Sequence, residues 1–266
     1  MVSLLKNVAT IRITTPIELI QAGEALQDSW FRGHGSTCWK LESTLERDAE
    51  RFGVMSKSLL KSEQTMLNLF KERAHLYDQN FVEPQSAFEW YSLIRHYGGP
   101  SRLFDVTSSY LVAAFFALNN SPRNTDAVVW AFKGCSTSDS KDLDDLLNNK
   151  AMQTEKVLIA KPDRLNVRIN AQSGCFFVPG SVEVSLKQQI SKTFETDIDI
   201  IDHDYSKIDE FENAVIKHKI FKLVIPHENH SNLFRFLSRC NVRAYSLYPG
   251  IEGLAASLQE MMRVFD

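Results

Sequence analysis

Three short stretches of this sequence hold residue types that could bind or react with an anionic ligand. The first, WFRGHG, places Arg32 directly before Gly33, His34 and Gly35. Arginine offers five donors in a planar fork that matches phosphate or carboxylate, and the glycines would let a ligand approach the backbone closely. A structural ion pair between Arg32 and an Asp or Glu is the alternative, and this stretch by itself leaves both interpretations open.

The second stretch, HYGGPSRLFDVTSS, crowds polar groups ahead of the apolar run YLVAAFFAL. Polar groups beside a buried helix must be satisfied by one another or by a ligand, and a helix N-terminus favours an anion. A helix cap with an Arg102–Asp105 ion pair is the alternative interpretation. The residues of this stretch that could contact a ligand are His96, Tyr97, Arg102, Asp105, Thr107 and Ser108.

The third stretch, RINAQSGCFF, contains Gln172 just before Ser173 and Gly174. Its alternating pattern predicts a strand around Gln172. The side-chain amide can hydrogen-bond a ligand, but it cannot be ionised. A polar residue at the edge of a strand is the alternative interpretation.

Other reactive residue types lack a supporting pattern. His227 and His230 are three positions apart, but no Cys and no third His lies near them, so no metal site is predicted. Cys38 and Cys175 have no local signature of a nucleophile. The chain also has no GxSxG, Walker or GxGxxG motif.

The elements that must position these residues follow from periodicity and from cap residues. Thr15 with Pro16 and Ser43 with Thr44 are expected to start helices, and Gly53 is expected to end one. The sequence predicts strands at 8–14, 30–33, 127–133, 157–162 and 221–227, and a bent strand or hairpin at 166–180. It predicts helices at 16–27, 45–53, 57–77, 84–98, 110–118, 228–241 and 252–265.

This order of elements predicts an α+β fold in a single domain, with a helical first half and a mixed β-sheet in the second half. Residues 134–150 are expected to form a polar loop or an exposed helix. The acidic segments 139–145 and 196–210 are interpreted as solvated surface.

Composition excludes several broad classes of protein. The chain has 266 residues, of which 44% are hydrophobic, and this is ample for a buried core. A net charge of -3 at pH 7 shows no basic excess of the kind typical of nucleic-acid-binding proteins. No apolar run approaches the length of a membrane span, no signal peptide is recognisable, and the Cys residues are widely spaced. We therefore expect a soluble cytoplasmic protein with free thiols.

The order of four stretches resembles the FRG domain family, which is named for an aromatic-Arg-Gly motif. These stretches are WFRGHGSTCWKLESTLER, HYGGPSRLFDVTSSYLVAAFFAL, RINAQSGCFF and SLYPGIEGLAASL. The resemblance spans roughly residues 28–260 and implies a strand-helix extension at 1–27 followed by an FRG domain at 28–266. The sequence departs from the family pattern, which usually has Gln at His34, Thr at Ser101 and Trp at Val106.

The same order is similar, more weakly, to the Arg-Ser-Glu class of ADP-ribosyltransferases. This similarity implies NAD as the cofactor and an ADP-ribosyltransferase-like fold. Arg32 would match the first motif of that class, and Thr107, Ser108 and Ser109 would stand near the second. Gln172 would fall near the third motif, where the enzymes carry a catalytic Glu.

That comparison also implies roles for the matched residues. The expected cofactor-binding residues are Arg32, Gly33, His34, His96, Tyr97, Arg102, Thr107 and Ser108. Arg32 would clamp the pyrophosphate or ribose of NAD, His34 and Tyr97 would line the nicotinamide pocket, and Thr107 and Ser108 would hold the ribose hydroxyls.

The expected catalytic residues are Arg32, Asp105 and Gln172. Because an amide cannot supply the negative charge that stabilises a ribosyl cation, Asp105 is the first choice for the acid. Glu155 and Glu183 are the alternatives.

The family resemblance implies a toxin or anti-phage defence effector that transfers ADP-ribose to RNA, DNA or protein and is restrained by a cognate antitoxin or inhibitor protein. Two other functions stay open. A non-enzymatic nucleotide or nucleic-acid sensor would bind phosphate through Arg32, Arg102 and Gln172. A hydrolase or nuclease would use Asp105, His96 and a metal ion.

Overall fold

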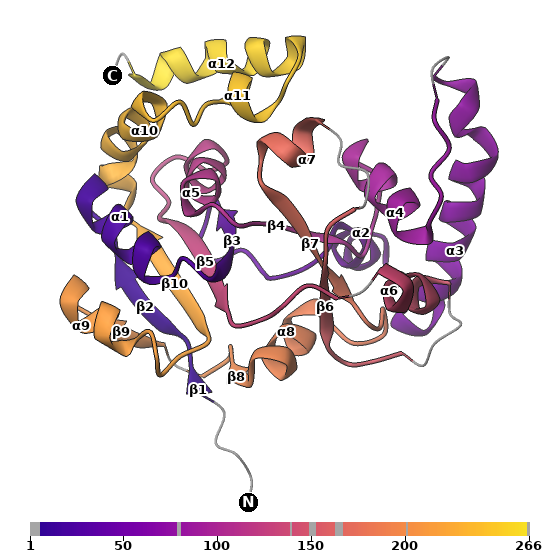
Figure 1. Cartoon of the computed structure of the whole chain (residues 1–266), viewed down its shortest axis with the longest axis horizontal. Coiled ribbons are helices and arrows are strands. Elements are labelled where there is room, and N and C mark those ends of the chain that lie inside the picture. Colours follow the sequence, from indigo (N-terminus) through magenta and orange to yellow (C-terminus); the bar gives the residue numbers. More distant parts are fainter. Residues whose placement is uncertain are drawn as a thin grey trace, which may run out of the picture.

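The computed structural model describes residues 6–78, 81–138, 140–148, 153–162, 167–200 and 202–264. An eight-stranded mixed sheet runs through the centre of the molecule, and helices lie on both sides of it (Figure 1). A separate two-stranded sheet joins the first strand of the chain to the eighth. The predicted α+β class in a single domain is confirmed.

The strands of the large sheet, in spatial order, are β6 (Val157–Ala160), β7 (Gly174–Pro179), β4 (Phe104–Thr107), β3 (Ser29–His34), β5 (Ala127–Lys133), β10 (Ile220–Ile225), β2 (Ala9–Arg12) and β9 (His203–Tyr205). The small sheet consists of β1 (Lys6–Asn7) and β8 (Thr196–Asp197). The helices are α1 (Pro16–Ala25), α2 (Thr44–Phe52), α3 (Ser56–Arg73), α4 (Ala87–His96), α5 (Tyr110–Asn119), α6 (Ser140–Leu147), α7 (Val167–Ala171), α8 (Leu186–Phe194), α9 (Ile208–Ala214), α10 (His230–Arg239), α11 (Ala244–Leu247) and α12 (Ile251–Val264), with short 3₁₀ turns η1 (Ala74–Leu76) and η2 (His227–Asn229).

β3 lies in the middle of the large sheet, antiparallel to β4 on one side and to β5 on the other. β10 pairs antiparallel with β5, and β2 and β9 then add in parallel orientation. On the other side, β7 and β6 extend the sheet in antiparallel orientation. The sheet draws on both halves of the chain, because β2 and β3 lie near the predicted strands at 8–14 and 30–33 and β4 also comes from the first half.

The central strand β5 is buried on both faces, as its unbroken apolar sequence indicates. Val129 and Ala131 belong to one core with α1, α5 and α10. Trp130 and Phe132, which alternate with them, belong to a second core with α8. A third core joins α3, α4 and α6 to β6 and β7. The sheet is therefore a middle layer with helices packed on both of its faces.

The glycines of the WFRGHG stretch allow α5 to lie directly against β3. A Cβ atom on Gly33 would stand 2.0 Å from the Ala113 carbonyl oxygen and 2.5 Å from Ala117 N. A Cβ atom on Gly35 would stand 2.3 Å from the Asn120 carbonyl oxygen. The space on the Cβ side of both glycines is thus filled by the backbone of α5 and of Asn120, which follows it. Gly35 therefore leaves no room for a ligand on that side, whereas Gly33 also lines the cavity described below.

Local signals locate several elements correctly. Thr15 and Ser43 form capping boxes with Glu18 and Glu46 at the starts of α1 and α2, and Gly53 ends α2 with φ of 68°. The predicted strand at 127–133 coincides with β5. Helices at 57–77 and 84–98 are also present, although α3 and α4 are shorter than predicted.

Several other segments differ from the prediction. β4, α8 and α9 lie where no element is predicted. The segment 166–180 begins outside the described residues, and its described part forms helix α7 followed by strand β7. Gln172 therefore follows a helix and does not lie within a strand.

The two acidic segments include residues 139 and 201, which lie outside the described residues. In the rest of the first segment, α6 is not simply solvated, because Leu143 is fully buried and Asp144 accepts a hydrogen bond from Phe88 N at 3.2 Å. The second segment supplies the short strands β8 and β9 at the margins of the two sheets.

Candidate functional site

One cavity of about 340 Å³ gathers residues from all three stretches. Its walls come from β3, β4, the last turn of α4, α5, α7, the start of β7 and the segment after α11. We call it the Arg32 cavity. The charged side chains that line it are Arg32, Arg95, Asp105 and Arg168. Three positive charges therefore face one negative charge among the described lining residues.

Asp105 stands at the centre of this charged group. Its Oδ2 accepts hydrogen bonds from Arg95 Nε at 2.9 Å and from Arg95 Nη2 at 2.6 Å. Arg32 Nη1 lies 3.3 Å from the same oxygen and donates to the Asp105 backbone carbonyl at 2.9 Å. The pairing of β3 with β4 brings Arg32 to Asp105, and α4 ends where Arg95 reaches the Asp105 carboxylate.

The two arginines control the protonation of Asp105. Burial alone would raise the pKa of the Asp105 carboxyl, but the charges of Arg95 and Arg32 hold it below its usual value. The Asp105 side chain nevertheless keeps 40% of its surface exposed. The cavity thus contains an ionised carboxylate that a ligand can contact.

Arg32 is fixed from several directions. Its guanidinium carbon lies 4.7 Å from the centre of the Phe104 ring, a distance typical of a cation–π contact. Burial lowers the pKa of Arg32, although Asp105 opposes that effect, and arginine stays charged in proteins. Arg32 Nε is buried and has no hydrogen-bond partner among the described residues. A buried donor without a partner is uncommon in native structures, where nearly all such groups are hydrogen-bonded.

Arg168 and the Tyr248 ring form a second cation–π pair in the wall of the cavity. Its guanidinium carbon lies 4.5 Å from the centre of the Tyr248 ring, and Tyr248 packs edge-on against Phe116. All three residues line the cavity. His96 also lines it, and burial followed by the charge of Arg168 lowers the pKa of His96. His96 is therefore neutral at pH 7, whereas Arg168 adds positive charge.

Thr107 and Gln172 line the cavity but are engaged with the protein. Thr107 Oγ1 donates to the Gln172 carbonyl at 2.7 Å and accepts from Ser109 N at 3.0 Å. Gln172 Nε2 donates to the Leu247 carbonyl at 3.0 Å. Gln172 thus ties the end of α7 to α11, and its amide oxygen remains for a ligand.

Four other predicted site residues lie elsewhere among the described residues. His34 is buried between Trp39 and Phe104 and does not line the cavity. Ser108 and Tyr97 are exposed outside its walls, although the Tyr97 ring packs edge-on against His96. The fourth residue is Arg102.

Arg102 is 1% exposed and forms an ion pair with Glu63, which is equally buried. Its Nε donates to Glu63 Oε1 at 2.8 Å, and its Nη1 donates to the Pro179 carbonyl at 3.4 Å. Arg102 does not line the Arg32 cavity. The Arg102–Asp105 pair of the alternative interpretation is not formed, because Arg102 binds Glu63 and Asp105 binds Arg95 and Arg32.

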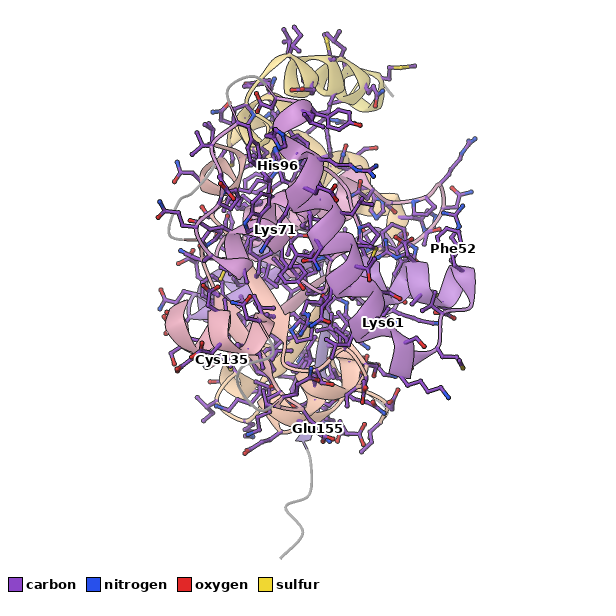
Figure 2. All side chains as sticks on the ribbon, turned by 90° about the vertical axis from the view of Figure 1, so that its right-hand side faces the viewer. Phe52, Lys61, Lys71, His96, Cys135 and Glu155 are labelled. Carbon is purple, nitrogen blue, oxygen red and sulfur yellow. The ribbon has the colours of Figure 1, made fainter. Side chains whose placement is uncertain are left out.

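The alternative acids are also distant from the charged group. Glu155 forms an exposed ion pair with Lys192, and Figure 2 shows it at the lower end of the molecule while His96 lies near the top. Glu183 lines a different cavity, together with Trp39 and Trp130. Asp105 is therefore the carboxylate that the structure brings to Arg32.

Neither candidate nucleophile is favoured by its surroundings. Cys175 lines the Arg32 cavity, but its buried thiol donates to the Ala160 carbonyl at 3.0 Å. Burial raises the pKa of Cys175 to about 12, so the reactive thiolate is suppressed. Cys38 is exposed and lies outside the cavity walls.

The two histidines considered for metal binding, His227 and His230, have different partners. His227 lies with Asp126 and Glu228 in a group whose potential ligand atoms are within 4.8 Å of one another. His230 Nε2 instead contacts the Ile225 carbonyl at 3.1 Å. Arg12 already forms an ion pair with Asp126 at 3.2 Å.

Sequence reasoning missed Arg95 and Arg168, which complete the positive lining. Arg95 belongs to the amphipathic helix α4, where a single arginine does not distinguish a ligand-binding residue from an ordinary surface residue. Arg168 opens the RINAQSGCFF stretch, where a strand is predicted, and a strand separates residues four positions apart by about 13 Å. The signal that could have found it is the Arg-x₃-Gln spacing, which places both residues on one side of a helix.

Comparison with known proteins confirms one resemblance. Residues 27–126 match the family model of the FRG domain. The match includes Arg32, Arg95 and Asp105, and it ends before Arg168. No curated protein and no solved structure matches the chain. The extension of the domain to residue 266 and the similarity to ADP-ribosyltransferases remain predictions.

No helix in the described part of the chain is both long enough and apolar enough to cross a membrane.

Proposed function

We propose that the Arg32 cavity binds the phosphate groups of a nucleotide of the NAD class. The observation that carries this proposal is the excess of positive charge, with Arg32, Arg95 and Arg168 around the single carboxylate of Asp105. Guanidinium groups in a concave site are suited to phosphate oxygens. The cavity volume of about 340 Å³ lies within the range of small-molecule sites.

The aromatic residues in the cavity wall favour a nucleotide as the ligand, rather than a simple anion such as phosphate. Tyr248 and Phe116 provide ring surface beside Arg168, and a base or nicotinamide ring can stack on such a surface. Phosphate groups would then lie toward Arg32 and Arg95. This arrangement uses Arg168 and Tyr248 in place of the predicted Tyr97 and Arg102.

Isothermal titration calorimetry tests this proposal with NAD, ADP-ribose and inorganic pyrophosphate as probes. Arg168→Ala should weaken binding of all three, because it removes one of three positive charges. Arg51→Ala removes an exposed arginine outside the cavity walls and should leave the affinity unchanged. Equal affinity in Arg168→Ala and wild type, or no binding by a folded wild-type protein, would refute the proposal.

A second candidate function, ADP-ribosyl transfer, is favoured by the ionised and partly exposed Asp105. In that reaction the bond between nicotinamide and the ribose C1′ breaks, and nicotinamide leaves with the electron pair. A nucleophile of the acceptor then bonds to C1′ and releases its proton. Asp105 would stabilise the ribosyl cation electrostatically, and Arg32 would hold the phosphates in position.

Nicotinamide release from NAD that is labelled in its ADP-ribose part tests this second function, with bacterial lysate as the source of acceptors. Release with transfer of label to RNA, DNA or protein would establish a transferase and reveal the acceptor class. Binding of NAD without release would favour the non-enzymatic nucleotide sensor.

The biological setting is proposed from the family resemblance. A toxin or anti-phage effector would act in the cytoplasm, where NAD and both classes of acceptor are present, and would need an antitoxin or inhibitor protein. Growth arrest on expression of the wild type, relieved by Asp105→Asn, is the expected result. Normal growth with ample wild-type protein would argue against a toxin.

A further inference from the structure

The helix α12 turns its apolar side toward solvent. Its large apolar residues are each more than half exposed, although they recur every three or four positions, as in a buried helix face. They are Ile251, Leu254, Leu258, Met261 and Met262. With 3.6 residues per turn, these positions fall on one side of the helix, and we call this surface the α12 stripe.

The opposite side of α12 is held to the protein by two specific contacts. A Cβ atom on Gly253 would stand 1.8 Å from the Tyr248 carbonyl oxygen, so only glycine fits there. Glu260 is buried, and its carboxylate accepts a hydrogen bond from Ala244 N at 2.6 Å. The helix cannot rotate to bury its stripe without breaking both contacts.

The location of α12 leaves the stripe open to a partner. The helix forms the upper edge of the molecule, beyond α10 and α11 (Figure 1). Seen from the side, its side chains project away from the body of the protein (Figure 2). No described element packs on this outer side, so the exposed surface is available.

Charge favours a second copy of the same helix as the occupant. Among the side chains of α12 that the structure describes, only Glu252 and Glu260 are ionisable, and Glu260 faces inward. When two α12 helices pair antiparallel, the two Glu252 side chains lie at opposite ends and do not repel each other. The helix dipoles then also oppose each other, which is favourable.

The area of the stripe is sufficient for such a pair. Five large apolar residues exposed to this degree present on the order of 500 Å², which is near the upper end for patches on monomers. Two copies would then bury about 1,000 Å², which meets the lower bound for a specific interface. Ala255 is exposed between the large side chains and would allow the two helices to approach closely.

We propose that the α12 stripe is a dimer interface, which pairs antiparallel with the α12 stripe of a second copy of this chain. An interface of this type is isologous, because each copy offers the same surface about a two-fold axis. The proposal does not depend on which ligand the Arg32 cavity binds. It does place the interface beside that cavity, since Tyr248 contacts Gly253 and also lines the cavity.

Sedimentation velocity over a range of protein concentrations tests this proposal. The wild type should sediment at twice the monomer mass, and Leu258→Glu should sediment as a monomer. Leu76→Glu is the matched control, because Leu76 is 70% exposed and Leu258 is 61% exposed, but Leu76 lies in η1. This control should remain a dimer.

Met262→Lys is a second variant in case Leu258→Glu fails to fold, since Met262 is 76% exposed. A wild type that stays monomeric at its highest soluble concentration would overturn the proposal. A dimer that neither substitution dissociates would also overturn it. A monomer that co-sediments with phosphatidylcholine and phosphatidylglycerol vesicles would assign the stripe to a lipid surface instead.

Discussion

The guanidinium of Arg32 binds both the backbone carbonyl and the side-chain carboxylate of Asp105. One nitrogen, Nη1, donates to the Asp105 carbonyl at 2.9 Å and lies 3.3 Å from the carboxylate Oδ2. The first contact holds the guanidinium against β4 whatever the charge of Asp105. The second leaves the carboxylate shared with Arg95, so one negative charge orients two positive groups and neutralises only part of their charge.

Replacing Asp105 by Asn should separate anion binding from catalysis. The change removes the only negative charge among the described lining residues, so repulsion of phosphate falls and pyrophosphate should bind several-fold more tightly. Nicotinamide release, if the wild type shows it, should be lost, because the cation is no longer stabilised. Calorimetry and a nicotinamide assay on the same preparations measure the two effects.

Arg95→Met provides the opposite change for comparison. It keeps an apolar stem but removes charge-assisted hydrogen bonds, so pyrophosphate should bind about 10-fold or more weakly. If Asp105→Asn and Arg95→Met shift the affinity in the same direction, the electrostatic description of the cavity is incorrect.

The parts of the site that the sequence predicted are those set by local rules. The strand carrying Arg32 ends at a recognisable aromatic and glycine motif, and Ser43 and Ser109 cap helices through their own side chains. Asp105 was recognised by residue type although its strand was not. β4 has four residues and lies between polar segments, so its length gives too little periodicity to detect.

The remaining parts depend on contacts between distant segments. Arg102 and Arg95 have the same side chain and both lie near Asp105 in sequence, yet only Arg95 reaches it. Arg102 turns instead toward Glu63 on α3, which no local pattern indicates. Arg168 was misplaced because the short helix α7 has an alternating sequence, and tertiary packing overrides that local preference.

Replacing Gly33 by Ala should destabilise the fold strongly. The added Cβ atom would meet two backbone atoms of α5, at 2.0 Å and 2.5 Å, and backbone cannot move aside as a side chain can. We expect a loss of about 3 kcal/mol or more in the free energy of unfolding, measured by urea denaturation.

Gly53→Ala is the control for this prediction. Gly53 has φ of 68°, and a Cβ atom added there would meet no other atom within 4 Å, so only backbone strain of about 1 kcal/mol is expected. Equal losses at the two positions would show that α5 does not pack closely on Gly33.

His34 should make the stability of the protein depend on pH below neutrality. Burial, followed by the charges of Arg32 and Arg47, lowers the pKa of His34 to about 3. The unfolded chain therefore takes up a proton near pH 6.5 while the folded protein does not, so stability falls as the pH drops below that value. Between pH 7 and pH 5 the loss from this residue is about 2 kcal/mol.

Urea denaturation of wild type and His34→Gln at both pH values measures this contribution. The variant has no group that titrates at this position, so its stability should fall by about 2 kcal/mol less than that of the wild type over the same interval. An identical pH dependence in the two proteins would show that His34 is accessible to protons in the folded state.

Removing one partner of the buried Glu63–Arg102 pair should harm the fold without affecting the cavity. Glu63→Gln leaves the guanidinium of Arg102 buried without a counter-charge, at a cost of about 3–5 kcal/mol in the free energy of unfolding. The double variant Glu63→Met with Arg102→Met removes both charges and should recover most of that loss. Its affinity for pyrophosphate should equal that of the wild type, because Arg102 does not line the Arg32 cavity. If the stable double variant binds pyrophosphate more weakly, Arg102 contributes to the ligand site as the sequence first indicated, and the ion pair with Glu63 must open when the ligand binds.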